Sequence, residues 1–284
     1  MNRPRADIVI KQIRRRARMT YARLCPDRIL HPSFLIIGAA RGGTTSLYAY
    51  LTAHPEVLPA RKKEINFFGK SYLRGWAWYL AYFPRKPHDS EVITGEASPN
   101  YMLYPAAAER VRRDIPGARL IAILRNPVDR AYSQFQLTRH LATEPLETFE
   151  EAIDREPERV DRELERLRHE PGLRSFELEQ FSYLTRGLYC DQLRIWADRF
   201  PRQQLLILCA EEFYADPSAT MHRVHDFLGI RRFDLPAYEP RHLHGQRLTY
   251  GPMKPDTRQR LIGYFRPHNQ KLGELARRSF PWDR

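Results

Sequence analysis

The stretch SFLIIGAARGGTTS (Ser33–Ser46) joins a short apolar run to a glycine-rich loop, and a helix-like segment follows from Ser46 to Ala53. The apolar run predicts a buried strand over Ser33–Gly38, so the whole unit reads as strand, loop and helix. Glycines allow several backbone N–H groups to point inward, and the helix N-terminus adds partial positive charge. This pattern is typical of a phosphate-binding loop, and an ordinary glycine-rich turn is the alternative.

Two more apolar runs, Ala118–Leu124 and Gln204–Cys209, are each followed by polar residues and a helical pattern (129–140 and 217–228). Val92–Gly95 is a weaker strand candidate. Buried strands that alternate with helices predict an α/β fold with a central parallel sheet flanked by helices. Ligands of such sheets bind beyond the carboxyl ends of the strands, so the polar residues after each strand are the candidates for function.

Length and composition favour one globular domain: the chain has 284 residues, of which 42% are hydrophobic. Its three cysteines, Cys25, Cys190 and Cys209, are odd in number and far apart. This spacing argues against a disulfide framework or a metal cage and favours a reducing compartment. Neither an apolar run of 18 residues nor a signal-peptide pattern is found, so we expect a cytoplasmic protein.

The formal net charge of +13 indicates an anionic partner. Residues 1–34 hold nine Lys/Arg and two Asp, a net +7, and we interpret residues 1–32 as a basic N-terminal arm. Apolar residues alternate with arginines there, which permits an amphipathic basic helix. A solvated arm, a contact with an anionic membrane surface through residues 1–30, and a polyanionic acceptor all remain open.

Residues 144–180 carry thirteen Asp/Glu and six Arg. Arg155, Arg159, Arg162 and Arg166 fall at helical spacing among acidic residues, which predicts a solvent-exposed helix laced by ion pairs. We interpret this segment as a charged helical insertion over the core, and we expect a last helix over 255–277.

A nucleoside triphosphatase is the obvious rival for the Ser33–Ser46 loop. Its P-loop requires Lys directly after the second spaced glycine and a Ser/Thr for magnesium. Here Gly43 is followed by Thr44, the cation lies earlier at Arg41, and the second strand ends in Arg125 rather than in an aspartate. The loop therefore favours a phosphate bound without metal, with a P-loop nucleotide kinase kept as the alternative.

Three ordered segments resemble one family. They are FLIIGAARGGTTSLYAYLTAHPEV from Phe34, KKEINFF at Lys62–Phe68 and LRNPVDRAYSQF at Leu124–Phe135. Together they resemble the sulfotransferases that use 3′-phosphoadenosine 5′-phosphosulfate (PAPS), most closely the heparan sulfate branch and its bacterial relatives. The resemblance implies a single P-loop-type sulfotransferase domain at 33–284. It would transfer a sulfuryl group from PAPS to an acceptor hydroxyl or amine, releasing adenosine 3′,5′-bisphosphate, without metal.

The resemblance also assigns donor-binding residues. The loop would wrap the 5′-phosphosulfate, and the 3′-phosphate would bind Arg125 and Ser133. Arg41 would stabilise charge on the bridging oxygen. Arg130 is either a second cation of the 3′-phosphate site or a surface charge, and we favour the surface charge. The implied loop contacts, with those of a last element before the C-terminal helix, are Arg41, Gly42, Gly43, Thr44, Thr45, Ser46, Arg247 and Tyr250.

On the acceptor side, the family's general base corresponds to Glu64, with a surface salt bridge as the alternative. Lys63 would bind donor or acceptor, and Glu96 would line the acceptor cleft. Asn66 stands where relatives often have His, and Ala97 stands where the heparan enzymes often have Lys.

A carbohydrate or glycolipid acceptor is what the resemblance implies, and a hydroxyl of a lipid or natural product is the alternative. A non-enzymatic basic protein that binds nucleic acid or anionic lipid would explain the N-terminal arm but not the three ordered motifs. We therefore expect no nucleic-acid partner, and a cytoplasmic protein that is peripheral at a membrane if the arm docks there.

Overall fold

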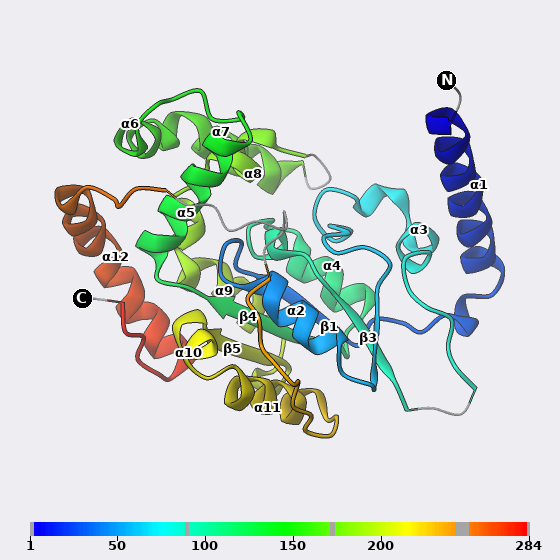
Figure 1. The fold of residues 1–284 in the computed structure, drawn as a ribbon. Helices are drawn as coiled ribbons and strands as arrows, with labels where there is room; N and C mark the ends of the chain where they lie inside the picture. The colour runs from blue at the N-terminus through cyan, green and yellow to red at the C-terminus, as the bar shows by residue number, and fades with distance from the viewer. Residues whose placement is uncertain (1–2, 89–90, 171–173, 242–249, 283–284) are drawn as a thin grey trace.

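A computed structural model describes residues 3–88, 91–170, 174–241 and 250–282 (Figure 1). At its centre lies a parallel sheet of five strands in the order β2-β3-β1-β4-β5, which confirms the predicted α/β fold. The strands are β1 (Phe34–Gly38), β2 (Val57–Pro59), β3 (Ile93–Ala97), β4 (Arg119–Leu124) and β5 (Leu205–Cys209). Four of these lie within two residues of their predicted positions, and β2 was not predicted.

Helices cover both faces of the sheet (Figure 1). Alternate residues of β1 explain why: Leu35 and Ile37 belong to one apolar cluster, and Phe34 and Ile36 belong to another. The first cluster includes α3 (Trp76–Leu80), α4 (Ala107–Asp114), α9 (Tyr189–Ala197) and part of α12 (Pro255–Ala276). The second includes α2 (Thr44–Thr52), α10 (Ala210–Ala215) and α11 (Pro217–Leu228). A strand buried on both faces must be apolar along its length, as β1 is and as β4 is after its first residue, Arg119.

Local sequence sets the helix ends. In α5 (Pro127–His140) the side chain of Asn126 accepts a hydrogen bond from the backbone N–H of Val128, and a proline begins the helix. Asp216 caps α11 in the same way, and Gly229 ends it with φ = 67°. These capping residues place α5 directly after β4, so the α5 N-terminus lies at the carboxyl edge of the sheet.

Residues 144–180 form α6 (Phe149–Asp154), α7 (Glu156–His169) and α8 (Phe176–Phe181), rather than one exposed helix. Ion pairs at i,i+3 spacing lace α7 as expected, for example between Arg166 and Glu163. The solvent-exposed reading was wrong for the segment as a whole, because apolar side chains on all three helices are buried in the core. They include Phe149, Ile153, Val160, Leu167 and Leu178.

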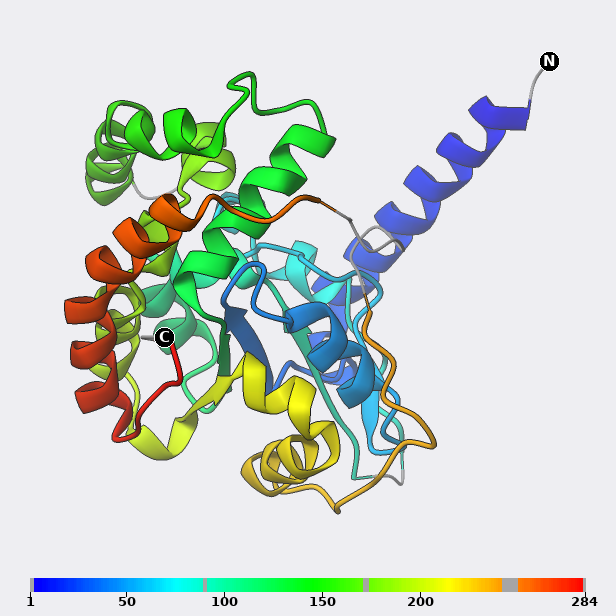
Figure 2. The same ribbon diagram turned by 60° about the vertical axis from the view of Figure 1, so that its left-hand side comes forward.

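The N-terminal arm forms one helix, α1 (Arg3–Leu24), that packs against α3 at its C-terminal end. Figure 2 shows the rest of α1 extending away from the body of the molecule.

Candidate functional site

A cavity of about 760 Å³ lies at the carboxyl edge of the sheet. The loop after β1, the residue after β4 and the helix α5 form one wall, and α8 with the segment before α9 forms another. This position is the one expected for ligands of parallel sheets. Its lining includes Arg41, Gly43, Thr44, Thr45, Glu64, Asn66, Lys70, Asn100, Arg125, Ser133, Thr138, Arg174, Glu179, Arg186, Tyr214, Arg241 and Tyr250.

The loop between β1 and α2 packs directly on β4. A Cβ at Gly42 would lie 2.4 Å from the backbone oxygen of Ile123, so only glycine fits there. Gly43, the residue directly before α2, has φ = 104°, a backbone conformation that residues with a side chain rarely adopt. This geometry aims the N-terminus of α2, with Thr44 and Thr45, at the cavity.

Ser46 differs from the other loop residues, because its hydroxyl forms hydrogen bonds with the backbone and does not line the cavity. Its Oγ accepts a hydrogen bond from the backbone N–H of Arg241 at 2.9 Å and donates to the Arg241 carbonyl at 3.3 Å. Ser46 therefore fixes the segment at Arg241 against the N-terminal turn of α2.

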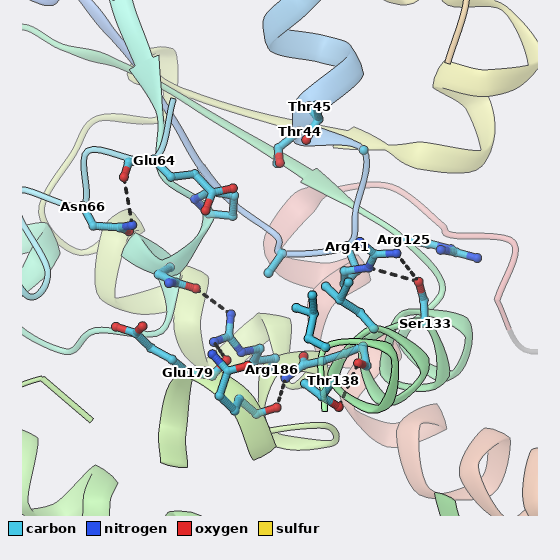
Figure 3. Close-up of a pocket in the computed structure, with 18 of the residues that line it drawn as sticks. Arg41, Thr44, Thr45, Glu64, Asn66, Arg125, Ser133, Thr138, Glu179 and Arg186 are labelled. Atoms are coloured by element: carbon cyan, nitrogen blue, oxygen red, sulfur yellow. Dashed lines mark hydrogen bonds between the residues drawn. The ribbon is translucent and has the colours of Figure 1, made fainter. Parts of the chain in front are cut away.

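Arg41, Arg125 and Ser133 come together on one side of the cavity (Figure 3). Arg41 donates from Nε at 3.1 Å and from Nη2 at 2.9 Å to the Ser133 hydroxyl. Burial, and then the neighbouring Arg125, lower the pKa of Arg41, although Tyr250 acts in the opposite direction. Among the described residues neither arginine forms an ion pair with a carboxylate. Two neighbouring cations without a carboxylate partner in the described part of the chain, one of them largely buried, favour the binding of an anion.

Glu64 and Asn66 line the opposite side (Figure 3). Both have positive φ, 59° and 54°, and the Glu64 N–H donates to the Ala97 carbonyl at 2.9 Å at the end of β3. The Glu64 carboxylate is 31% exposed and accepts from Lys63 Nζ at 2.8 Å, so the proposed base also has the salt bridge considered as its alternative. Lys63 itself is not among the lining residues.

Asn66 has an unsatisfied acceptor. Its Nδ2 donates to the Glu64 carbonyl at 3.2 Å, but its Oδ1 is buried and has no hydrogen-bond partner within the described part of the chain. Such a group is costly unless a ligand supplies the donor. Among the described residues, the Asn66 Oδ1 is therefore a buried acceptor left unpaired beside Glu64.

Glu96 was expected to line the acceptor cleft, and the structure places it elsewhere. It is fully buried, and its carboxylate accepts hydroxyl hydrogen bonds from Tyr79 at 2.9 Å, Ser98 at 2.6 Å and Tyr101 at 2.5 Å. Burial raises its pKa, against the opposing effect of these donors. Glu96 positions Asn66 indirectly, because the Ser98 hydroxyl that donates to Glu96 also accepts a hydrogen bond from the Asn66 N–H at 2.9 Å.

A charged wall opposite the α2 N-terminus was not predicted. Arg186 donates to Asn100 Oδ1 at 2.7 Å, and burial lowers its pKa to about 10. Glu179 accepts from Lys70 Nζ and from the Tyr104 hydroxyl, each at 2.6 Å. No local signal distinguishes these residues from surface charges, because Glu179 on α8 and Arg186 in the segment before α9 reach the cavity only through long-range packing.

Arg130 was interpreted as a surface charge, and this was wrong. It is fully buried, donating from Nη1 to Gln134 Oε1 at 2.7 Å and from Nη2 to the Tyr183 carbonyl. The helix α5 packs against the segment before α9, and the buried Arg130 side chain connects these two parts of the cavity wall.

The last predicted donor element is only partly visible. Arg247 lies outside the described residues. Tyr250 lines the cavity, with its ring edge-on to Tyr132 at 5.4 Å. Within the described ranges, no three His, Cys, Asp or Glu side chains are grouped so that they could hold a metal ion. None of the described helices is long and apolar enough to cross a membrane.

Several known proteins are similar to this chain in sequence or in fold. The family model for the sulfotransferase domain matches residues 31–239. A membrane-associated sulfotransferase of Dictyostelium discoideum, kil1, is 27% identical over 88% of this chain and 66% of its own length. Mouse heparan sulfate glucosamine 3-O-sulfotransferase 6 is 30% identical over 91% of this chain and 75% of its own length. The human bifunctional heparan sulfate N-deacetylase/N-sulfotransferase 3 is 32% identical over 88% of this chain, which spans 30% of that protein.

Among solved structures, a sulfotransferase from Alicyclobacillus acidocaldarius superposes with a TM-score of 0.73 at 30% identity. The superposition covers 90% of this chain and all of that one.

Proposed function

Because this chain belongs to the sulfotransferase family, we propose that its cavity binds PAPS, with the 5′-phosphosulfate at the 38–46 loop and the 3′-phosphate at Arg125 and Ser133. The observation that carries the proposal is a pair of cations in one wall of the cavity: Arg41 donates to the Ser133 hydroxyl, and Arg125 lines the wall beside them. A nucleotide with phosphates at two ends satisfies both cations, whereas a triphosphate chain has its charge at one end only.

The residues present fit this donor. Gly42 lets the loop pack directly on β4, since a Cβ there would lie 2.4 Å from the Ile123 backbone oxygen, and this packing places the N-terminal N–H groups of α2 at the cavity. The N-terminus of α2 adds partial positive charge at the same point. Arg41 is largely desolvated, which strengthens its attraction for an anion.

PAPS supplies a sulfuryl group on a good phosphate leaving group. In the proposed reaction the acceptor oxygen or nitrogen forms a bond to sulfur while the bond from sulfur to the bridging phosphate oxygen breaks. Glu64 takes the acceptor's proton, and Arg41 with the loop N–H groups stabilises the charge on the departing phosphate. A guanidinium keeps its proton at neutral pH, so Arg41 acts by charge alone. Positioning and electrostatics then supply most of the rate, as in phosphoryl transfer.

For the acceptor we propose a carbohydrate or glycolipid hydroxyl or amine. Two matched relatives are named for heparan sulfate, and the cavity wall at Lys70, Arg174 and Glu179 is polar and charged. The unsatisfied Asn66 Oδ1 beside Glu64 would accept a hydrogen bond from this substrate. Lys63, held by Glu64, and Arg247 remain proposed substrate and donor contacts.

The same proposal includes a basic arm at 1–32, a sulfotransferase domain at 33–284 and a cytoplasmic protein without a nucleic-acid partner. One matched relative is named as membrane-associated, which supports peripheral contact with a membrane.

A thermal-shift comparison tests the donor. We expect adenosine 3′,5′-bisphosphate to raise the melting temperature without metal, and ATP with magnesium to raise it much less. Preferential stabilisation by ATP with magnesium would instead favour a P-loop kinase, and stabilisation by neither would contradict the donor site.

A further inference from the structure

The outward side of α1 carries a stripe without aromatic or charged residues. Ile13, Ala17, Thr20 and Leu24 are all exposed, Ile13 by 60% and Leu24 by 76%. Their spacing of four, three and four residues places them within an arc of about 60° on a helix with 3.6 residues per turn. The inward side is already used, because Met19 and Ala22 pack on the core.

Arginines flank this stripe. On the same helical geometry Arg14 lies beside it on one edge, and Arg16 and Arg23 lie on the other; all three are exposed. Residues 8–26 contain six Lys/Arg and neither Asp nor Glu. The outward side of α1 therefore presents exposed apolar groups between two rows of cations.

The cations of α1 also lack compensation on the inward side. Arg18 Nε is buried without a hydrogen-bond partner among the described residues. Burial lowers the pKa of Arg18, and the like charges of Arg61, Arg14 and Arg15 lower it further. The arginines of α1 therefore repel one another, and an anionic surface beside the outward, exposed Arg14 would relieve part of this repulsion.

We propose that the α1 stripe, defined as Ile13, Ala17, Thr20 and Leu24 with its flanking arginines, binds the surface of an anionic phospholipid bilayer. The helix would lie in the interface, with Ile13 and Leu24 inserted at the acyl boundary and the arginines among the phosphates. A polyanion in water, such as a nucleic acid, would form ion pairs with the arginines but would not bury the apolar stripe between them. The inference specifies the membrane contact proposed above and is independent of the sulfuryl-transfer chemistry.

The attachment of α1 suits this role. Its C-terminal half is fixed to the domain, where Arg85 lies over the Tyr21 ring at 4.3 Å and Arg15 lies 5.7 Å from the centre of the Trp78 ring. The extended part stands clear of the sheet and its cavity (Figure 2). Binding through the stripe would hold the catalytic domain beside the bilayer without covering the cavity.

Co-sedimentation of the full chain with vesicles tests the proposal. Vesicles of phosphatidylcholine with about one third phosphatidylserine should bind the protein, and pure phosphatidylcholine should bind it at least about tenfold more weakly, since each arginine near an anionic surface contributes about fivefold. The double variant Ile13→Ser/Leu24→Ser should lose about tenfold or more in affinity for the anionic vesicles. It should keep wild-type affinity for heparin and for duplex DNA.

Two matched pairs control for charge and for added apolar surface. Arg14→Ser/Arg16→Ser should weaken vesicle binding, whereas Arg162→Ser/Arg266→Ser, with the same charge loss on other helices, should not. Thr20→Leu should strengthen binding about threefold or more, and Gln12→Leu, off the stripe, should do so less. Circular dichroism and binding of adenosine 3′,5′-bisphosphate show that each variant is folded. Wild-type vesicle binding by Ile13→Ser/Leu24→Ser, or tighter binding to DNA than to vesicles, would overturn the proposal.

Discussion

Replacing Arg125 with Ala should weaken binding of adenosine 3′,5′-bisphosphate far more than binding of adenosine 5′-phosphate. The two nucleotides differ only in the 3′-phosphate, which we place against Arg125 and Ser133. The backbone at this position is held independently of the side chain, because the Arg125 carbonyl accepts the Tyr189 hydroxyl at 2.8 Å. We therefore expect the variant to fold.

The size of the effect follows from burial. A fully exposed ion pair contributes at most about 1 kcal/mol, and truncating a buried hydrogen-bonded pair costs about 2–5 kcal/mol. Arg125 is half-buried and lies beside Arg41, so an intermediate value of about 2–3 kcal/mol is expected. This corresponds to a loss of about 30- to 150-fold in affinity.

Isothermal titration calorimetry with both nucleotides measures the difference. Adenosine 5′-phosphate should lose less than about threefold, since only the general positive field changes. Arg139→Ala, which eliminates an exposed arginine near the C-terminal end of the same helix α5, should alter neither affinity. Equal losses for the two nucleotides would place Arg125 at the 5′ end or in the general field, and refute its assignment to the 3′-phosphate.

Three further predictions concern the base, the loop and the fold. Glu64→Gln should lower kcat for a heparan sulfate oligosaccharide or another active acceptor by about 10²- to 10⁴-fold while nucleotide binding is unchanged or slightly tighter; retained turnover would contradict the base assignment. Gly42→Ala should lower the free energy of unfolding in urea by about 2 kcal/mol or more, whereas Gly117→Ala, where a Cβ meets nothing within 4 Å, should be nearly neutral. Burial lowers the pKa of His225 to about 4 from 6.5, so stability should fall as pH drops from about 6.5 to 4, where only the unfolded chain binds the proton. His225→Gln should remove up to about 3 kcal/mol of that fall; an unchanged pH profile would argue against it.

Much of the fold was predictable because its strands are buried on both faces. Continuous apolar runs such as Ala118–Leu124 identify β4 without knowledge of tertiary contacts. The strand β2 was missed since it has three residues, ends in a proline and shows too little pattern to read. The α1 helix was anticipated from its alternation of apolar and basic residues.

The site was predictable where residues follow strands. Arg41, Arg125, Ser133 and Glu64 all line the cavity, as their positions after β1 and β4 or in a recognisable motif suggested. Residues whose place depends on long-range packing were not. Arg130 looks like any helical arginine until the Tyr183 carbonyl covers it, and the position of Glu96 on a strand does not reveal that three hydroxyls enclose it.

The Arg41–Ser133 contact has a consequence for how the two ends of a nucleotide communicate. Ser133 Oγ accepts both Nε and Nη2 of Arg41, so one hydroxyl connects the residues proposed for the two phosphates. The Ser133 hydroxyl can donate its own proton to an anion while it accepts from Arg41, so a phosphate bound there would be polarised together with the Arg41 guanidinium. In the proposed binding mode the two subsites are thus thermodynamically linked, and the coupling free energy is the same whichever end binds first. Inorganic phosphate should therefore bind weakly at either subsite. The intact bisphosphate should bind more tightly than the separate affinities of its 3′-phosphate and 5′-phosphate halves predict.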